Sequence, residues 1–129
     1  DRPRLTVANG LSPERLRAQI DRVAALNAEL APFRILTGIE VDILDGGALD
    51  QEPELLAELD VVVASVHSKL RMDGDAMTRR MVRAIANPHV DVLGHCTARL
   101  IQGSRGTRPA SVFDAHAVFE ACPAFAAAV

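Results

Sequence analysis

Hydrophobic residues recur every three or four positions near the start of the chain, a spacing typical of an amphipathic helix. The recurrence runs from Leu16 to Leu30. It follows Ser12-Pro13-Glu14, in which Ser can cap free N–H groups, Pro fits the first turn, and Glu favours the positive end of the helix dipole. Pro32 disfavours further helix. We therefore predict a helix from Ser12 to about Ala31.

Three later stretches carry the apolar and β-branched residues of strands. Residues 34–44 alternate in part between apolar and polar side chains, and they end in the turn Asp45-Gly46-Gly47. Residues 60–66 form a nearly continuous apolar run, which is typical of a strand buried on both faces of a parallel sheet. Val90 to Leu93 predicts a third, shorter strand.

Helical patterns separate and follow these strands. They cover three segments, namely Asp50 to Leu59, a segment that begins at Asp73 or Asp75 and ends before Asn87-Pro88, and Ser111 to Ala121. Pro123 is expected to end the last helix, and Ala126 to Val129 to open a further strand that the chain does not complete. The alternation of helices and strands predicts an α/β fold, with a parallel sheet or barrel and right-handed crossovers.

Composition limits the classes of protein that fit this pattern. The 129 residues suffice for one domain, and 49% of them are hydrophobic and 24% charged, as in ordinary globular proteins. The net charge of -3 excludes a strongly basic nucleic-acid tail but leaves room for a local basic patch. No apolar run approaches the roughly 18 residues of a membrane helix. Two cysteines make no disulfide framework, so we expect a cytoplasmic protein.

Three potential metal ligands stand in or just after successive predicted strands. They are Glu40, His67 and His95, separated by 27 and 28 residues, about one strand–helix unit each. Functional groups of parallel α/β folds gather at the carboxyl ends of the strands, so these side chains should converge. A lone His there is more often an ordinary polar residue, but an unpaired Glu in an apolar strand is costly. Zn, Mn or Fe accepts this mixture of ligands.

Cationic and hydroxyl side chains follow the two histidines on the same side of the sheet. They are Ser68, Lys69 and Arg71 after His67, and Thr97, Arg99, Arg105 and Arg108 after His95. Arg and Lys beside a metal suit a phosphate ester, although such loops are polar in any protein. Lys69 and Arg99 are stronger candidates for phosphate binding than the loop arginines Arg105 and Arg108.

The remaining candidates are interpreted as structural or solvated. His89 precedes its strand and so lies at the opposite end, and His116 falls in the last helix and faces solvent. Cys96 points away from His95 if the strand continues to it. Cys122 is assigned to packing. A solvated helix face is expected for Arg79, Arg80 and Arg83.

Three sequence blocks resemble the PHP family, which is named for polymerase and histidinol phosphatase. The blocks are GIEVDIL at 38–44, LDVVVASVHSKL at 59–70 and NPHVDVLGHCTARL at 87–100. LTVANGLSPERL at 5–16 also matches. The likeness covers nearly the whole chain. It is closest to the branch found as the carboxyl-terminal domain of bacterial family X DNA polymerases and in stand-alone bacterial PHP proteins.

The resemblance implies a distorted (β/α)7 TIM-like barrel that hydrolyses phosphate esters by metal-activated water. The metal cluster would hold Zn, Mn or Fe, with up to three ions in a complete domain. Glu40 resembles the bridging carboxylate, while His67 and His95 resemble two ligands of one metal, so these three would carry the catalysis. Ser68, Lys69 and Arg99 would bind the substrate phosphate.

The chain also departs from the family pattern. The opening His-x-His, a second early His and a late Asp-x-His are absent, and Asp1 stands where a ligating His is expected. The chain starts without Met and stops at Val129 after an apolar run. We therefore expect residues 1–129 to be the central portion of a single PHP domain, incomplete at both ends and inactive alone.

Three other functions stay open at this point. One is a 3′-5′ exonuclease or proofreading module of a family X DNA polymerase, acting on DNA 3′ ends, although the mild acidity of the segment argues weakly against DNA binding by itself. Another is a histidinol phosphatase. The third is a non-catalytic PHP scaffold whose metal site has decayed.

Overall fold

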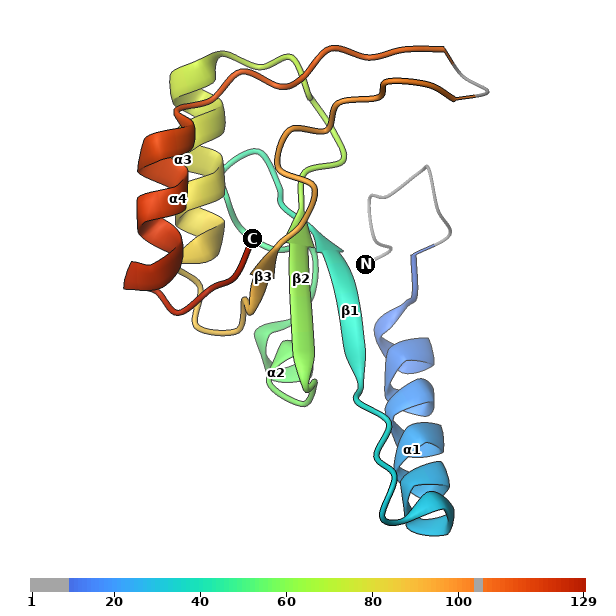
Figure 1. The fold of residues 1–129 in the computed structure, drawn as a ribbon. Helices are drawn as coiled ribbons and strands as arrows, with labels where there is room; N and C mark the ends of the chain where they lie inside the picture. Colours follow the sequence, from blue (N-terminus) through green and yellow to red (C-terminus); the bar gives the residue numbers. More distant parts are fainter. Residues whose placement is uncertain (1–9, 104–105) are drawn as a thin grey trace.

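Three parallel strands form the sheet in the part of the chain that the computed structural model describes, residues 10–103 and 106–129 (Figure 1). They are β1 (Gly38–Asp42), β2 (Val61–Ser65) and β3 (Val92–Leu93), in the order β1-β2-β3. Glu40 pairs with Val63 and Val63 pairs with Val92. The protein is therefore of the α/β class, and the carboxyl ends of all three strands lie at one edge of the sheet.

Four helices accompany these strands in the described part of the chain: α1 (Pro13–Leu30), α2 (Pro53–Leu56), α3 (Gly74–Ile85) and α4 (Ala115–Ala124). α3 and α4 pack against each other on one side of the sheet, and α1 lies on the β1 side (Figure 1). Capping side chains stabilise the first turns of α1, α3 and α4. Ser12 accepts from Arg15 N–H, and Asp73 accepts from the N–H groups of Asp75 and Ala76.

The hydrophobic core lies between the sheet and the pair α3 and α4. It joins residues of all three strands to one face of α3, namely Val41, Val62, Ala64 and Leu93 with Met77, Met81, Ala84 and Ile85. From α4 it takes Val118, Ala121 and Cys122. The members from α3 recur every three or four residues, as an amphipathic helix requires.

α1 contributes little to this core. Of its described residues, Leu16 is the buried one, and the chain that follows exposes Phe33 and Leu36. In the apolar stripe predicted for this helix, Ile20, Val23 and Leu26 are partly buried and Leu30 is exposed.

Several predicted boundaries are wrong for identifiable reasons. β1 begins at Gly38 rather than at residue 34, because the Asp60 carboxylate binds the side chain of Arg34 and the N–H of Thr37 and so holds that segment outside the sheet. The helix predicted from residue 50 to 59 spans only Pro53–Leu56.

The end of the chain also differs from the prediction. α4 starts after Asp114, whose carboxylate accepts the N–H of Ala117, so residues 111–114 lie outside the helix. Pro123 does not break α4 but lies in its last turn. The strand expected at 126–129 is reduced to one parallel bridge, in which Leu93 N–H donates to Ala128 O at 2.8 Å.

None of the helices in the described ranges combines the length and the hydrophobicity that crossing a lipid bilayer requires.

The chain just after β3 passes so close to β2 that a larger side chain at Gly94 is predicted to destabilise the protein. A Cβ at Gly94, just after β3, would overlap Ser65 Oγ and lie 2.9 Å from Val63 Cγ1. Overpacking of this kind destabilises proteins by about 1–3 kcal/mol. We expect Gly94→Ala to lower the free energy of unfolding by that amount in urea denaturation. Gly46→Ala is the control, because a Cβ there meets nothing within 4 Å. Equal stability of the two variants would contradict the described packing.

Candidate metal centre

Glu40, His67 and His95 come together at the carboxyl edge of the sheet. Glu40 lies in β1, while each His lies two residues beyond the end of its strand, β2 or β3. Glu40 Oε1 is 3.2 Å from His67 Nε2 and 2.9 Å from His95 Nε2. The two imidazole rings meet edge to face, with centroids 5.1 Å apart. The expected convergence of the three side chains is thus found in the structure.

The three donor groups fit a divalent metal ion. One ligand atom from each residue lies within 4.8 Å of the others. In a tetrahedral zinc site with bonds near 2.0–2.1 Å, neighbouring ligand atoms are about 3.3 Å apart, close to the distances from Glu40 to the two imidazoles. Both Nε2 atoms face the same carboxylate oxygen, an arrangement that a shared cation stabilises. The group can therefore hold a metal.

The local backbone and charge support this reading. His95 has a positive φ of 21°, an uncommon conformation for a residue other than glycine and one that clusters at functional sites. The interaction with the Ser65 hydroxyl is the largest influence that lowers the pKa of the Glu40 carboxyl, and His95 and His67 lower it further against desolvation. Ser65 Oγ is buried and has no hydrogen bond of normal geometry with the described residues. A lowered pKa favours the carboxylate form of Glu40, the form that binds a metal.

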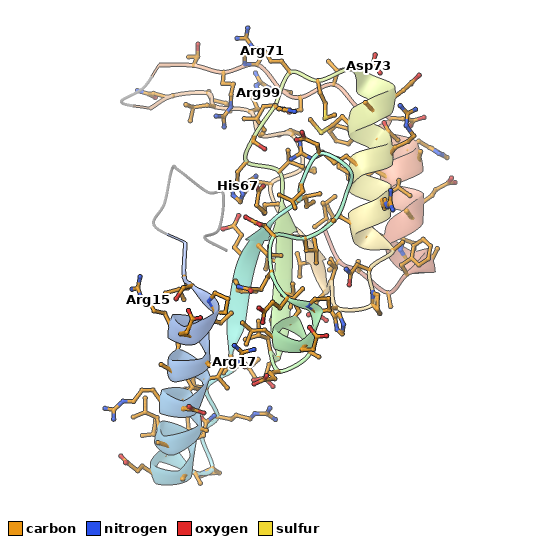
Figure 2. All side chains as sticks on the ribbon, turned by 180° about the vertical axis from the view of Figure 1, so that it is seen from behind. Arg15, Arg17, His67, Arg71, Asp73 and Arg99 are labelled. Atoms are coloured by element: carbon orange, nitrogen blue, oxygen red, sulfur yellow. The ribbon has the colours of Figure 1, made fainter. Side chains whose placement is uncertain are left out.

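A cavity of about 240 Å³ borders the two histidines. Its lining combines apolar and cationic side chains: Val66, His67, Leu70, His95, Ala98, Arg99 and Arg108. Arg108 Nε donates to Ala98 O at 2.7 Å, which fixes that guanidinium at the wall. Arg99 and Arg71 lie at the same end of the molecule as His67, whereas Arg15 and Arg17 extend from α1 (Figure 2). Arg99 thus lies where the sequence predicted a phosphate-binding residue.

The other predicted phosphate ligands are engaged elsewhere. Lys69 forms an ion pair with Asp45. Ser68 is an acceptor for Arg80, through its carbonyl oxygen at 2.9 Å and its hydroxyl at 3.3 Å. Neither residue lines the cavity beside the histidines. Asp1 and Arg105 lie outside the described residues.

One expectation about the arginines is wrong. Arg80 is 1% exposed rather than solvated, whereas Arg79 and Arg83 are exposed as expected. Burial lowers the pKa of the Arg80 guanidinium, and the charges of Asp42 and Asp45 oppose that effect. The sequence did carry a signal, since Arg80 lies three residues after the buried Met77 and so falls on the inner face of α3.

Asp42 was given no role by the sequence. It is 4% exposed, and its Oδ1 accepts the backbone N–H of His67 at 3.2 Å. The same oxygen lies 3.4 Å from His67 Nδ1. The available signal was the alternation of β1, which puts residues 40 and 42 on one face.

The remaining interpretations agree with the structure. His89 precedes β3, and His116 is exposed, 3.3 Å from Glu120. Cys122 is buried in the core, and Cys96 is partly buried and packs against the core. Both cysteines are free thiols.

The chain is similar in sequence to a DNA polymerase and to proteins named probable phosphatases. The chain is 48% identical over 97 residues to the DNA polymerase/3'-5' exonuclease PolX of Bacillus subtilis, a match that covers 75% of this chain and 17% of that protein. It is 42% identical over 74 residues to a probable phosphatase of Thermoanaerobacter sp., covering 54% of this chain and 30% of the relative. No family model matches the chain.

A third relative has the same kind of name, a probable phosphatase of Caldanaerobacter subterraneus, 38% identical over 65 residues, which are 47% of this chain and 26% of that protein. The chain therefore spans less than a third of the length of each of these relatives.

The geometry predicts metal binding that depends on Glu40. We expect the protein to bind Zn²⁺ in isothermal titration calorimetry, and Glu40→Gln to weaken binding at least about tenfold, since loss of even an outer-shell partner has that effect. Glu120→Gln is the matched control, because it also removes a carboxylate beside an imidazole, that of His116. Equal affinities for all three proteins would contradict a site at Glu40.

Proposed function

We propose that the chain is part of a PHP-type, metal-dependent phosphoesterase domain. The observation that carries the proposal is the convergence of Glu40, His67 and His95 beside a cavity that Arg99 lines. The parallel sheet is compatible with part of a TIM-like barrel. The probable phosphatases and PolX among the relatives support the same family-level function.

In this proposal Glu40, His67 and His95 act together as metal ligands. A divalent ion held there, Zn, Mn or Fe, would supply a Lewis acid for the phosphoryl oxygens and lower the pKa of water. Glu40 is suited to its role because its pKa is lowered, and the side chains of Glu40 and His95 are about half exposed, so substrate can reach them. The side chain of His67 is more enclosed.

The cavity beside these ligands has a cationic part and an apolar part, each suited to a different part of a substrate. Arg99 and Arg108 would bind the phosphate oxygens, because guanidinium groups match phosphate geometry. Val66, Leu70 and Ala98 would contact the apolar part of the esterified group and exclude water from one side. Lys69 is given no phosphate role, since its charge is paired with Asp45.

A 3′-5′ exonuclease module of a family X DNA polymerase is the second candidate. The relative named DNA polymerase/3'-5' exonuclease PolX favours it, as does the gathering of Arg71 and Arg99 at the end of the molecule that holds His67. Hydrolysis of histidinol phosphate and a non-catalytic scaffold have no specific observation in their favour. The cytoplasmic location stays a prediction.

Activity measurements on the full-length protein test this function. With Mn²⁺ or Zn²⁺, we expect hydrolysis of either p-nitrophenyl phosphate or a labelled single-stranded oligonucleotide, and the preferred one separates the two candidates. Arg99→Met should lower kcat/KM at least about tenfold, because a preorganised cation at the phosphate is lost. Lys69→Met should change kcat/KM less than about threefold, because Lys69 forms an exposed ion pair with Asp45 and does not line the cavity.

Two results would count against the proposal. A metal-loaded protein that hydrolyses neither compound would favour the scaffold. Equal losses in Arg99→Met and Lys69→Met would contradict the assignment of the phosphate site to the cavity.

A further inference from the structure

Two charged residues are buried directly behind the candidate metal centre. Within the described ranges, Asp42 and Arg80 are the charged residues that fall in the buried class, at 4% and 1% exposure. Burial of a charge is strongly unfavourable unless hydrogen bonds and an opposite charge compensate it. Hydrophobic side chains in their places would often be at least as stabilising. Their contacts therefore need an explanation beyond core stability.

Arg80 links the chain segments that follow β1 and β2. Its Nε donates to Ile43 O at 3.0 Å, and Nη2 donates to the same oxygen. Its Nη1 donates to Ser68 O at 2.9 Å, and Nη2 lies 3.3 Å from Ser68 Oγ. Ile43 follows Asp42 and Ser68 follows His67 directly in sequence. One planar guanidinium on α3 thus fixes both segments, a fork that a lysine cannot reproduce.

Asp42 contacts His67 at two points. Its Oδ1 accepts the backbone N–H of His67 at 3.2 Å and lies 3.4 Å from Nδ1 of the ring, a buried atom that makes no hydrogen bond of normal geometry with the described residues. A carboxylate at that distance favours the tautomer that carries its proton on Nδ1. The lone pair of Nε2 then faces Glu40 Oε1, 3.2 Å away, where a cation between them is stabilised. Carboxylates behind metal-bound imidazoles play this part in many metal sites.

We propose that Asp42 and Arg80 are positioning residues for His67. Arg80 holds the segments after β1 and β2 in register through Ile43 and Ser68, and Asp42, the residue before Ile43, orients the imidazole so that Nε2 points at the metal position. The inference rests on the proposed function, because it assumes that His67 is a metal ligand. It adds two residues that touch neither metal nor substrate and act only through His67.

Metal affinity separates this role from a purely structural one. Asp42→Asn keeps the size and an acceptor oxygen for the His67 N–H but removes the negative charge. Arg80→Lys keeps the charge but removes the fork. We expect each to weaken Zn²⁺ and Co²⁺ binding about 10–100-fold in calorimetry, and to change the visible spectrum of the Co²⁺-loaded protein. Far-UV circular dichroism and thermal unfolding verify that each variant is folded at the temperature of measurement.

The chain offers matched controls for both substitutions. Arg79→Lys alters an exposed arginine beside Arg80 on α3, and Asp21→Asn alters an exposed carboxylate on α1. Both should bind metal as the unaltered protein does. Should Arg80→Lys fail to fold, Asp42→Asn carries the test, because it preserves the shape of the buried site.

Three outcomes decide the matter. Weakened binding and an altered Co²⁺ spectrum in folded variants support the positioning role. Binding and spectra equal to those of the unaltered protein, in folded Asp42→Asn or Arg80→Lys, overturn this inference and leave the proposed function standing. If the unaltered protein itself binds neither metal, the proposed function fails and this inference fails with it.

Discussion

The parallel register of the three strands is the constraint on which the rest of the structure depends. Because Glu40 pairs with Val63 and Val63 with Val92, side chains on β1 and just beyond β2 and β3 reach the same edge of the sheet. Any slip of one residue would turn Glu40 to the other face. Strand pairing therefore brings close together ligands that are far apart in the sequence.

Packing beneath that edge makes the arrangement rigid. α3 lays Met77 and Met81 on the sheet and, from the same face, sends Arg80 up to the segments after β1 and β2. The helix thus serves the core and the site at once. A cavity lined by Arg99 and Arg108 borders the two histidines, so the candidate centre is accessible from it.

Much of this could be predicted from the sequence, because local patterns determine it. Continuous apolar runs identified β2, and the spacing of Glu40, His67 and His95 by one strand–helix unit predicted their convergence. Contacts between residues far apart in the sequence could not be predicted from local patterns. Asp60 binds the segment before β1 and so shortens that strand, and Lys69 pairs with Asp45, a contact that no local pattern indicates. Arg80 is buried because it lies on the inner face of α3, although its charge favours exposure.

X-ray absorption spectroscopy of the Zn²⁺-loaded protein tests the central claim most directly, since it counts imidazole ligands by their outer-shell scattering. The account predicts nitrogen and oxygen neighbours at about 2.0–2.1 Å, with scattering from two imidazoles that falls to one in His95→Ala. A spectrum without imidazole scattering, or one unchanged by that substitution, would contradict a centre built on Glu40, His67 and His95.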